Sequence, residues 1–253
     1  MKNNLLVCHH FFEDPLKIPF KTHAHDKWEF LFIAKGNPTC MVEGKRYTIS
    51  ENTLIIFKSG QIHRVQTTQA QPYEYISIMC DESLLSSSIV DRINKSAIIL
   101  RFINSNVTYR RLCKFCEQNQ CAIDTLSPAV KSRRICELLD IVLDGLNKGY
   151  HPLLVSEDPI VRNAISYIED NLHSISRLDQ ICDALGVTKE KLYCHFTQNM
   201  LISPMKYVRA KRAALVKAVS LDTDNRVDIL KKYGFKNEEL FDEAYTSFYR
   251  SVP

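Results

Sequence analysis

The pattern of apolar residues changes near Asp81, and this change limits the possible folds most strongly. Between Leu31 and Met79, short runs rich in β-branched and aromatic residues recur between turn signals such as KGNP and KSGQ. This spacing predicts a small antiparallel barrel or sandwich. After Asp81, apolar residues lie three and four positions apart, which is the period of a helix. The sequence therefore predicts an α+β chain with a β-rich first part and a helical remainder.

A linker pattern divides the helical part in two. A long helical segment ends at Gly149, and YHPLLVSEDP follows with two prolines. Asp158 is a good N-cap for the next helix, with Pro159 at its first position. We predict a barrel over 1–82, a helical connector over 83–152 and an all-α region over 153–253.

Targeting and cysteine signals point to a reducing compartment. The N-terminus lacks the pattern of a secretory signal, and no uncharged apolar run approaches the roughly 18 residues of a membrane span. The nine cysteines favour reduced, buried thiols over disulfides. Cys113, Cys116 and Cys121 lack a second CxxC to complete a metal site, which favours packing. We predict a cytoplasmic protein without membrane contact.

Three histidines and a glutamate are spaced so that they can converge in the β-rich part. His23 and His25 alternate along a strand and share one face, Glu29 can join them, and His63 follows the GQ turn. Such a set could bind a divalent metal, or it could form hydrogen bonds and line a ligand pocket. Trp28 and neighbouring apolar residues could line that pocket or simply form core.

Residues 176–198 have the form of a helix-turn-helix. Ile181 and Leu185 form the buried face of a first helix, Gly186 permits a tight turn and Thr188 caps a second helix. Leu192 should face inward. The outward positions of the second helix are Lys189, Lys191, Tyr193 and His195.

The next helix adds a basic flank with Lys206, Arg209, Lys211 and Arg212. Between Ser174 and Leu221, eight basic residues stand against three acidic ones, although the whole chain has a net charge of only +4. Such a flank suits contacts with nucleic-acid phosphates, and a solvated helix face is the alternative.

Both regions resemble known families. HAHDKWEFLFIAKG is similar to the first cupin motif, and FKSGQIHRVQT to a weakened second one. The helix-turn-helix, followed by Ser203, Pro204 and Tyr207, is similar to that of AraC/XylS-type regulators. The resemblance implies a cupin-like antiparallel β-barrel, a helical connector and a double helix-turn-helix.

By this resemblance the chain is a DNA-binding transcription regulator that controls promoter activity, not an enzyme, and carries no cofactor. The barrel would bind a small-molecule or protein effector at a pocket formed by His23, His25, Glu29, His63 and Trp28. The same residues except Trp28 remain the candidates for a divalent metal.

A homodimer through the helix from Pro128 to Asn147 is a further alternative. The apolar stripe that would form the dimer surface consists of Val130, Ile135, Leu138, Leu139, Val142 and Leu146. The same stripe is equally suited to packing on the barrel.

The second helix-turn-helix, about 227–248, departs from the family pattern. Its recognition helix is acidic, with Glu238, Glu239, Asp242 and Glu243. Four carboxylates would be repelled by DNA phosphates. This motivates an alternative function, a co-regulator with weakened DNA binding that acts through protein contacts.

Overall fold

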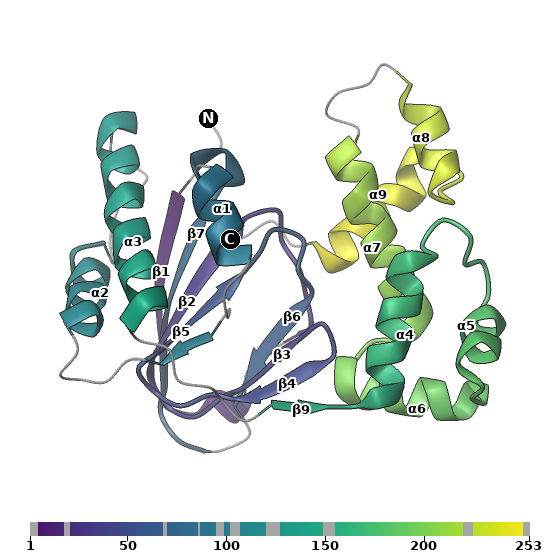
Figure 1. The fold of residues 1–253 in the computed structure, drawn as a ribbon, viewed down its shortest axis with the longest axis horizontal. Coiled ribbons are helices and arrows are strands. Elements are labelled where there is room, and N and C mark those ends of the chain that lie inside the picture. The colour runs from purple at the N-terminus through teal and green to yellow at the C-terminus, as the bar shows by residue number, and fades with distance from the viewer. Residues whose placement is uncertain are drawn as a thin grey trace.

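The computed structural model describes residues 5–17, 21–67, 70–85, 87–94, 99–101, 107–119, 127–148, 155–219 and 225–249. Two antiparallel sheets form its first part (Figure 1). The larger sheet has the strand order β1-β7-β2-β5-β8, and the smaller has the order β6-β3-β4-β9. The strands are β1 Leu5–Phe12, β2 Trp28–Lys35, β3 Thr39–Val42, β4 Lys45–Thr48, β5 Thr53–Phe57, β6 His63–Gln66, β7 Tyr73–Cys80, β8 Ile99–Arg101 and β9 Val155–Glu157.

Strand β2 is buried on both faces because it lies inside the larger sheet. Leu31 and Ile33 pack in the core with residues of the smaller sheet such as Cys40 and Val42. Trp28 and Phe30 belong to another cluster, with apolar residues of the connector helices. Successive side chains alternate between faces, so Trp28 points away from Glu29. The prediction that Trp28 lines one pocket with Glu29 is therefore corrected.

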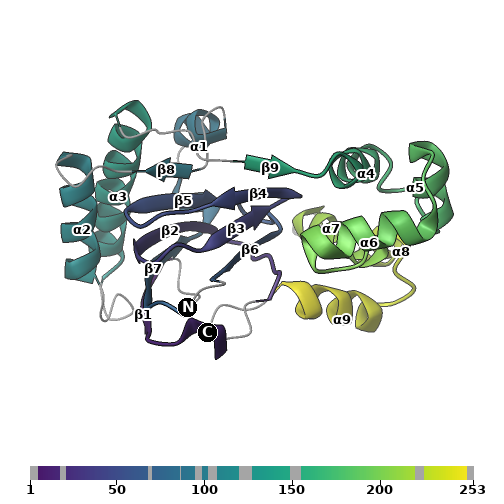
Figure 2. The same ribbon diagram turned by 90° about the horizontal axis from the view of Figure 1, so that it is seen from below.

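The connector helices cover the outer face of the larger sheet (Figure 2). They are α1 Ser87–Asn94, α2 Val107–Asn119 and α3 Pro128–Lys148, and short 3₁₀ helices span Pro15–Lys17 and Glu82–Leu84. In the apolar stripe of α3, the four residues Ile135, Leu138, Leu139 and Val142 pack against the sheet. These four are therefore barrel contacts, and dimerisation stays a prediction.

The last third of the described chain is helical. Its helices are α4 Pro159–Asp170, α5 Leu178–Leu185, α6 Lys189–Met200, α7 Pro204–Val219, α8 Arg226–Lys232 and α9 Glu238–Phe248. The predicted caps are confirmed: the Asp158 side chain accepts from Ile160 N and Val161 N, and that of Thr188 accepts from Lys191 N. Gly186 has a φ of 64°, which is the left-handed conformation that the turn requires. The predicted α+β class is confirmed.

Three strands were not predicted. β1 pairs with β7, β8 with β5, and β9 with β4, each at the periphery of its sheet. Strand β9 lies in the segment that was predicted to be a linker, and α4 begins shortly after it. The smaller sheet is therefore connected directly to α4.

Cys121 lies outside the described residues. Within the described part of the chain, no helix has the length and apolar character needed to cross a membrane.

Candidate functional site

A buried cluster of histidines surrounds Glu29 between the two sheets. Nε2 of His25 lies 3.0 Å from Oε2 of Glu29, and Nε2 of His63 lies 3.4 Å from the same oxygen. The Ser77 hydroxyl donates a short hydrogen bond to Oε1. Burial disfavours the charged carboxylate, but the hydrogen bond from His25 and the electrostatic influence of the neighbouring His25 and His63 together outweigh burial and hold the pKa of Glu29 well below its usual value. Glu29 is therefore a buried anion.

The partners of His25 define its protonation. Nδ1 lies 2.7 Å from the carbonyl oxygen of Lys27, which can only accept, so Nδ1 donates. Nε2 faces the Glu29 carboxylate and donates as well. Burial opposes this second proton, but the hydrogen bond to Glu29, the charge of Glu29 and the contact with the Lys27 carbonyl oxygen together outweigh burial and raise the pKa of His25. His25 and Glu29 thus form a buried ion pair.

His23 completes a group of three imidazoles. Nδ1 of His23 lies 2.9 Å from the carbonyl oxygen of Lys21, and burial together with His63 lowers the pKa of His23 to about 4. His23, His25 and His63 each offer one ligand atom within 4.8 Å of the others. The predicted set is brought together, and with Glu29 it suits a transition metal once His25 loses its second proton.

This cluster lies next to the contact between the barrel and the C-terminal helices. Ala24, between the two histidines, donates from its backbone N–H to the carbonyl oxygen of Phe248 at 3.3 Å. Gly44, in the turn after β3, packs against α4 so closely that a Cβ there would come within 2.9 Å of Ile165. Met41 belongs to the same apolar cluster as α4, α6 and α7. The barrel therefore shares a core with the helix-turn-helix.

A largely buried lysine crosses this contact. Nζ of Lys211, on α7, lies 2.8 Å from Glu43 of the barrel and 3.1 Å from Glu169 of α4. Its ammonium also lies 5.5 Å from the centre of the Tyr207 ring. Burial disfavours the charge, whereas Tyr207 and the two carboxylates favour it, and the balance raises the pKa of Lys211. Lys211 is thus a charged link between the barrel and the helices.

A polar chain continues from Lys211 into the barrel. Glu43 accepts from Nε2 of Gln61 at 3.4 Å. The carbonyl oxygen of Gln61 lies 2.9 Å from Nδ1 of His63, which faces Glu29 through its other nitrogen. We call these five residues the Lys211–Glu29 chain. It joins α7 to the buried histidine cluster.

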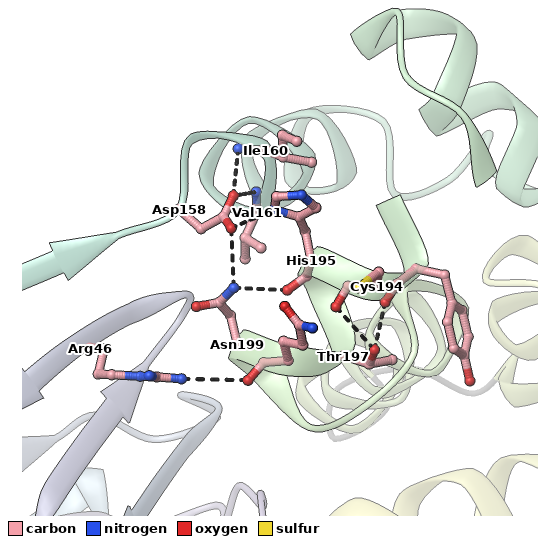
Figure 3. Close-up of polar contacts among 10 residues, drawn as sticks. Arg46, Asp158, Ile160, Val161, Cys194, His195, Thr197 and Asn199 are labelled. Atoms are coloured by element: carbon pink, nitrogen blue, oxygen red, sulfur yellow. Dashed lines mark hydrogen bonds and ion pairs between the residues drawn. The ribbon is translucent and has the colours of Figure 1, made fainter. Parts of the chain in front are cut away.

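A second connection runs through β9 to α6 (Figure 3). β9 pairs with β4 and leads directly to Asp158. Besides capping α4, Oδ2 of Asp158 lies 2.7 Å from Nδ1 of His195 and 3.2 Å from Nδ2 of Asn199, both on α6. Arg46 of β4 also donates to the Gln198 carbonyl oxygen at 3.4 Å. The edge of the smaller sheet is therefore tied to the second helix of the helix-turn-helix.

The eight residues expected to contact DNA divide into two groups. Lys211 and His195 make the contacts described above, and Arg212 donates to the carbonyl oxygens of Leu172 and Ile175 at 2.7 and 2.6 Å. These three are engaged within the protein, so the expectation that they face DNA is corrected. The other five are exposed, although Lys189 is paired with Asp179 at 2.6 Å: Lys189, Lys191, Tyr193, Lys206 and Arg209.

The second helix-turn-helix has its own core, but it has an acidic exterior. Phe235 and Phe241 meet edge to face in a cluster with Val216 and Leu230. Glu238 is paired with Arg226, while Glu239, Asp242 and Glu243 are exposed. A pocket of about 570 Å³ between α7 and α9 is lined by Lys206, Arg209 and Glu243, among others. Opposite charges thus meet at the junction of the two modules.

Comparison with known proteins identifies the family. The AraC-like ligand binding domain family matches residues 13–157, which is more than half of the chain. The chain belongs to this family. The AraC-like match covers the connector helices, the smaller sheet and every strand of the larger sheet except β1, and it ends at the last residue of β9.

Two curated relatives are transcription regulators by name. The uncharacterized HTH-type transcriptional regulator YbfP of Bacillus subtilis is 29% identical over 94 residues, which is 37% of this chain and 32% of that protein. The XylDLEGF operon transcriptional activator 2 of Pseudomonas putida is 23% identical over 103 residues, or 39% of this chain and 66% of that protein. The matched region therefore spans about a third of YbfP and just under two thirds of the XylDLEGF operon activator.

Solved structures of two AraC-like proteins align with most of the chain. ToxT from Vibrio cholerae O395 is 11% identical, with 100% of this chain and 96% of that chain covered and a TM-score of 0.43. The AraC-like transcriptional activator CuxR is 16% identical, with 90% and 82% covered and a TM-score of 0.40.

Several residues of the domain contact were missed from the sequence. Glu43 and Gly44 form a tight turn, in which both have a positive φ, between two short strands. That turn could have been predicted, but its packing against α4 could not. Asp158 carried a clear capping signal, whereas its contacts with His195 and Asn199 depend on how α4 and α6 cross.

Proposed function

We propose that the chain is a DNA-binding transcription regulator whose barrel responds to an effector or a partner. The observation that carries the proposal is the position of α6. Lys189, Lys191 and Tyr193 are exposed on this helix, whereas His195 and Asn199 contact Asp158 at the end of a barrel strand. One helix thus offers cations for phosphates and is held by a strand of the barrel.

The Lys211–Glu29 chain supplies a route for the response. An effector that contacts His25 or His63 would disturb the contacts of these histidines with Glu29 and shift the loop that carries Gln61. Glu43 and Lys211 would then change partners, and α7 would be free to move relative to the barrel. The effector must bind more tightly either to the arrangement in which Lys211 contacts Glu43 or to the one in which this contact is broken. The difference between these two affinities sets the size of the response.

The test is to map the DNA bound by the tagged chain in its source cell. We expect discrete promoter sites that are lost in the double variant Lys191→Ala, Arg209→Ala. Lys35→Ala, which removes an exposed cation of the barrel, should leave the sites unchanged. Absence of discrete sites for the unmodified chain would overturn the proposal.

The acidic surface of α9 supports a second candidate, a co-regulator that acts through protein contacts. Glu239, Asp242 and Glu243 are exposed on this helix. In the same experiment, sites that persist in the double variant and require another regulator for their occupancy would favour this function.

A further inference from the structure

A basic pocket lies between α2 and α3, on the outside of the connector. It has a volume of about 470 Å³, within the range of small-molecule sites. We call it the α2–α3 pocket. Its lining residues are Arg111, Lys114, Gln118, Arg133, Arg134, Glu137 and Ile141. Only Ile141, which belongs to the core beneath the helices, is fully apolar.

The charges in this pocket do not balance. Four cations face a single lining carboxylate, Glu137, whose Oε2 lies 3.0 Å from Nη1 of Arg134. Arg111 has a distant partner in Asp144, at 3.9 Å. Among the described residues, no carboxylate pairs with Lys114 or Arg133. Like charges that line one pocket repel one another, so a bound anion would stabilise the helix pair.

Arg134 adds an unsatisfied donor. Its Nε is buried and lacks a hydrogen-bond partner among the described residues. A buried N–H without an acceptor is costly, and a guanidinium can engage phosphate through two parallel hydrogen bonds. The pocket thus combines excess positive charge with a donor that needs an acceptor.

We propose that the α2–α3 pocket binds a small molecule carrying two or more phosphate groups. Its volume exceeds what one phosphate ion fills, and three arginines favour bidentate phosphate contacts. DNA does not suit it, because α2 and α3 lie on the opposite side of the sheets from α5 and α6 (Figure 1). This site is separate from the barrel cluster and from the function proposed above.

Calorimetric titration of the full chain with ATP and with pyrophosphate tests the proposal, and citrate serves as a carboxylate control. We expect both phosphate probes to bind in the micromolar range and at least about tenfold more tightly than citrate. Arg111→Gln with Arg133→Gln should weaken both phosphate probes by at least about tenfold. Arg110→Gln, an exposed position of α2 outside the pocket, should retain their affinity.

Glu137→Gln removes the competing carboxylate and should strengthen binding of both phosphate probes severalfold, which also tests the site if the double variant fails to fold. Binding of neither probe below about 1 mM would overturn the proposal. Equal loss in Arg110→Gln, or equal affinity for citrate, would also overturn it.

Discussion

At the scale of single residues, Leu201 carries backbone strain that a glycine would relieve. It follows α6 with a φ of 57°, and the residue is about half exposed. A left-handed conformation costs a non-glycine residue about 1 kcal/mol. We expect Leu201→Gly to raise the free energy of unfolding by about 0.5–1 kcal/mol, measured by urea denaturation. Leu215→Gly, in the interior of α7, should lower it by about 1 kcal/mol, and a loss in both variants would contradict this account.

Asp158 should be sensitive both to substitution and to pH. Burial disfavours its charge, but His195 and the backbone N–H groups of Val161 and Ile160 outweigh burial and lower its pKa from 3.8. Its contribution to stability is therefore full above the unfolded-state pKa and is lost as the pH falls through the lower folded-state value. Asp158→Ala should cost about 1–2 kcal/mol at pH 7, and Asp158→Asn less because asparagine still caps a helix.

The pH dependence of stability distinguishes the capping contribution of Asp158 from the contribution of its charge. If the carboxylate matters as proposed, urea denaturation of Asp158→Asn between pH 5 and pH 3 should show a smaller loss of stability than the unmodified chain. Equal slopes would show that its charge contributes nothing.

Single residues also show where prediction from sequence stops. Gly186 and Thr188 were predicted because a turn and a cap depend on local backbone geometry. Lys211 and Arg212 could not be assigned to the interior, because the sequence of α7 does not reveal which face the barrel covers. The orientation of Trp28 could have been inferred from alternation with Glu29.

At the scale of elements, the peripheral strands were the hardest part of the fold to predict. β8 and β9 have three residues each, and they are strands because β5 and β4 offer unpaired edges. Such pairing is tertiary and leaves little local signal. The central strands and α4 to α6 were predicted because their apolar periodicity and caps agree with the fold.

Helix α9 permits a prediction about the second module. If it approaches DNA, neutralising Asp242 and Glu243 with the double variant Asp242→Asn, Glu243→Gln should strengthen DNA binding by about three- to tenfold at low salt. Glu51→Gln, an exposed barrel residue, should have no effect. Fluorescence anisotropy with a labelled DNA fragment measures the affinity of the double variant and of Glu51→Gln. Unchanged affinity in the double variant would indicate that α9 stays away from the DNA.

At the scale of the whole molecule, the account depends on the barrel and helices forming one coupled unit. Lys211→Met should lower the free energy of unfolding by about 1–3 kcal/mol because it leaves two carboxylates without their cation. In a double-mutant cycle with Glu43→Gln, the coupling should be about 1 kcal/mol, since Glu43 is partly exposed to water. The same cycle with the exposed Lys206→Met in place of Lys211→Met should give a coupling energy near zero. Equal coupling energies in the two cycles would contradict the proposed link between Lys211 and Glu43.

The most direct test of the central claim is the salt dependence of DNA affinity. On a fragment recovered by the mapping experiment, the unmodified chain should bind with an affinity that falls steeply as salt rises. In the double variant Lys191→Ala, Arg209→Ala, the slope of log K against log salt should shrink by about 2, because two phosphate contacts are lost. No binding even at about 50 mM salt, or an unchanged slope in the variant, would contradict the claim that α6 and α7 contact DNA.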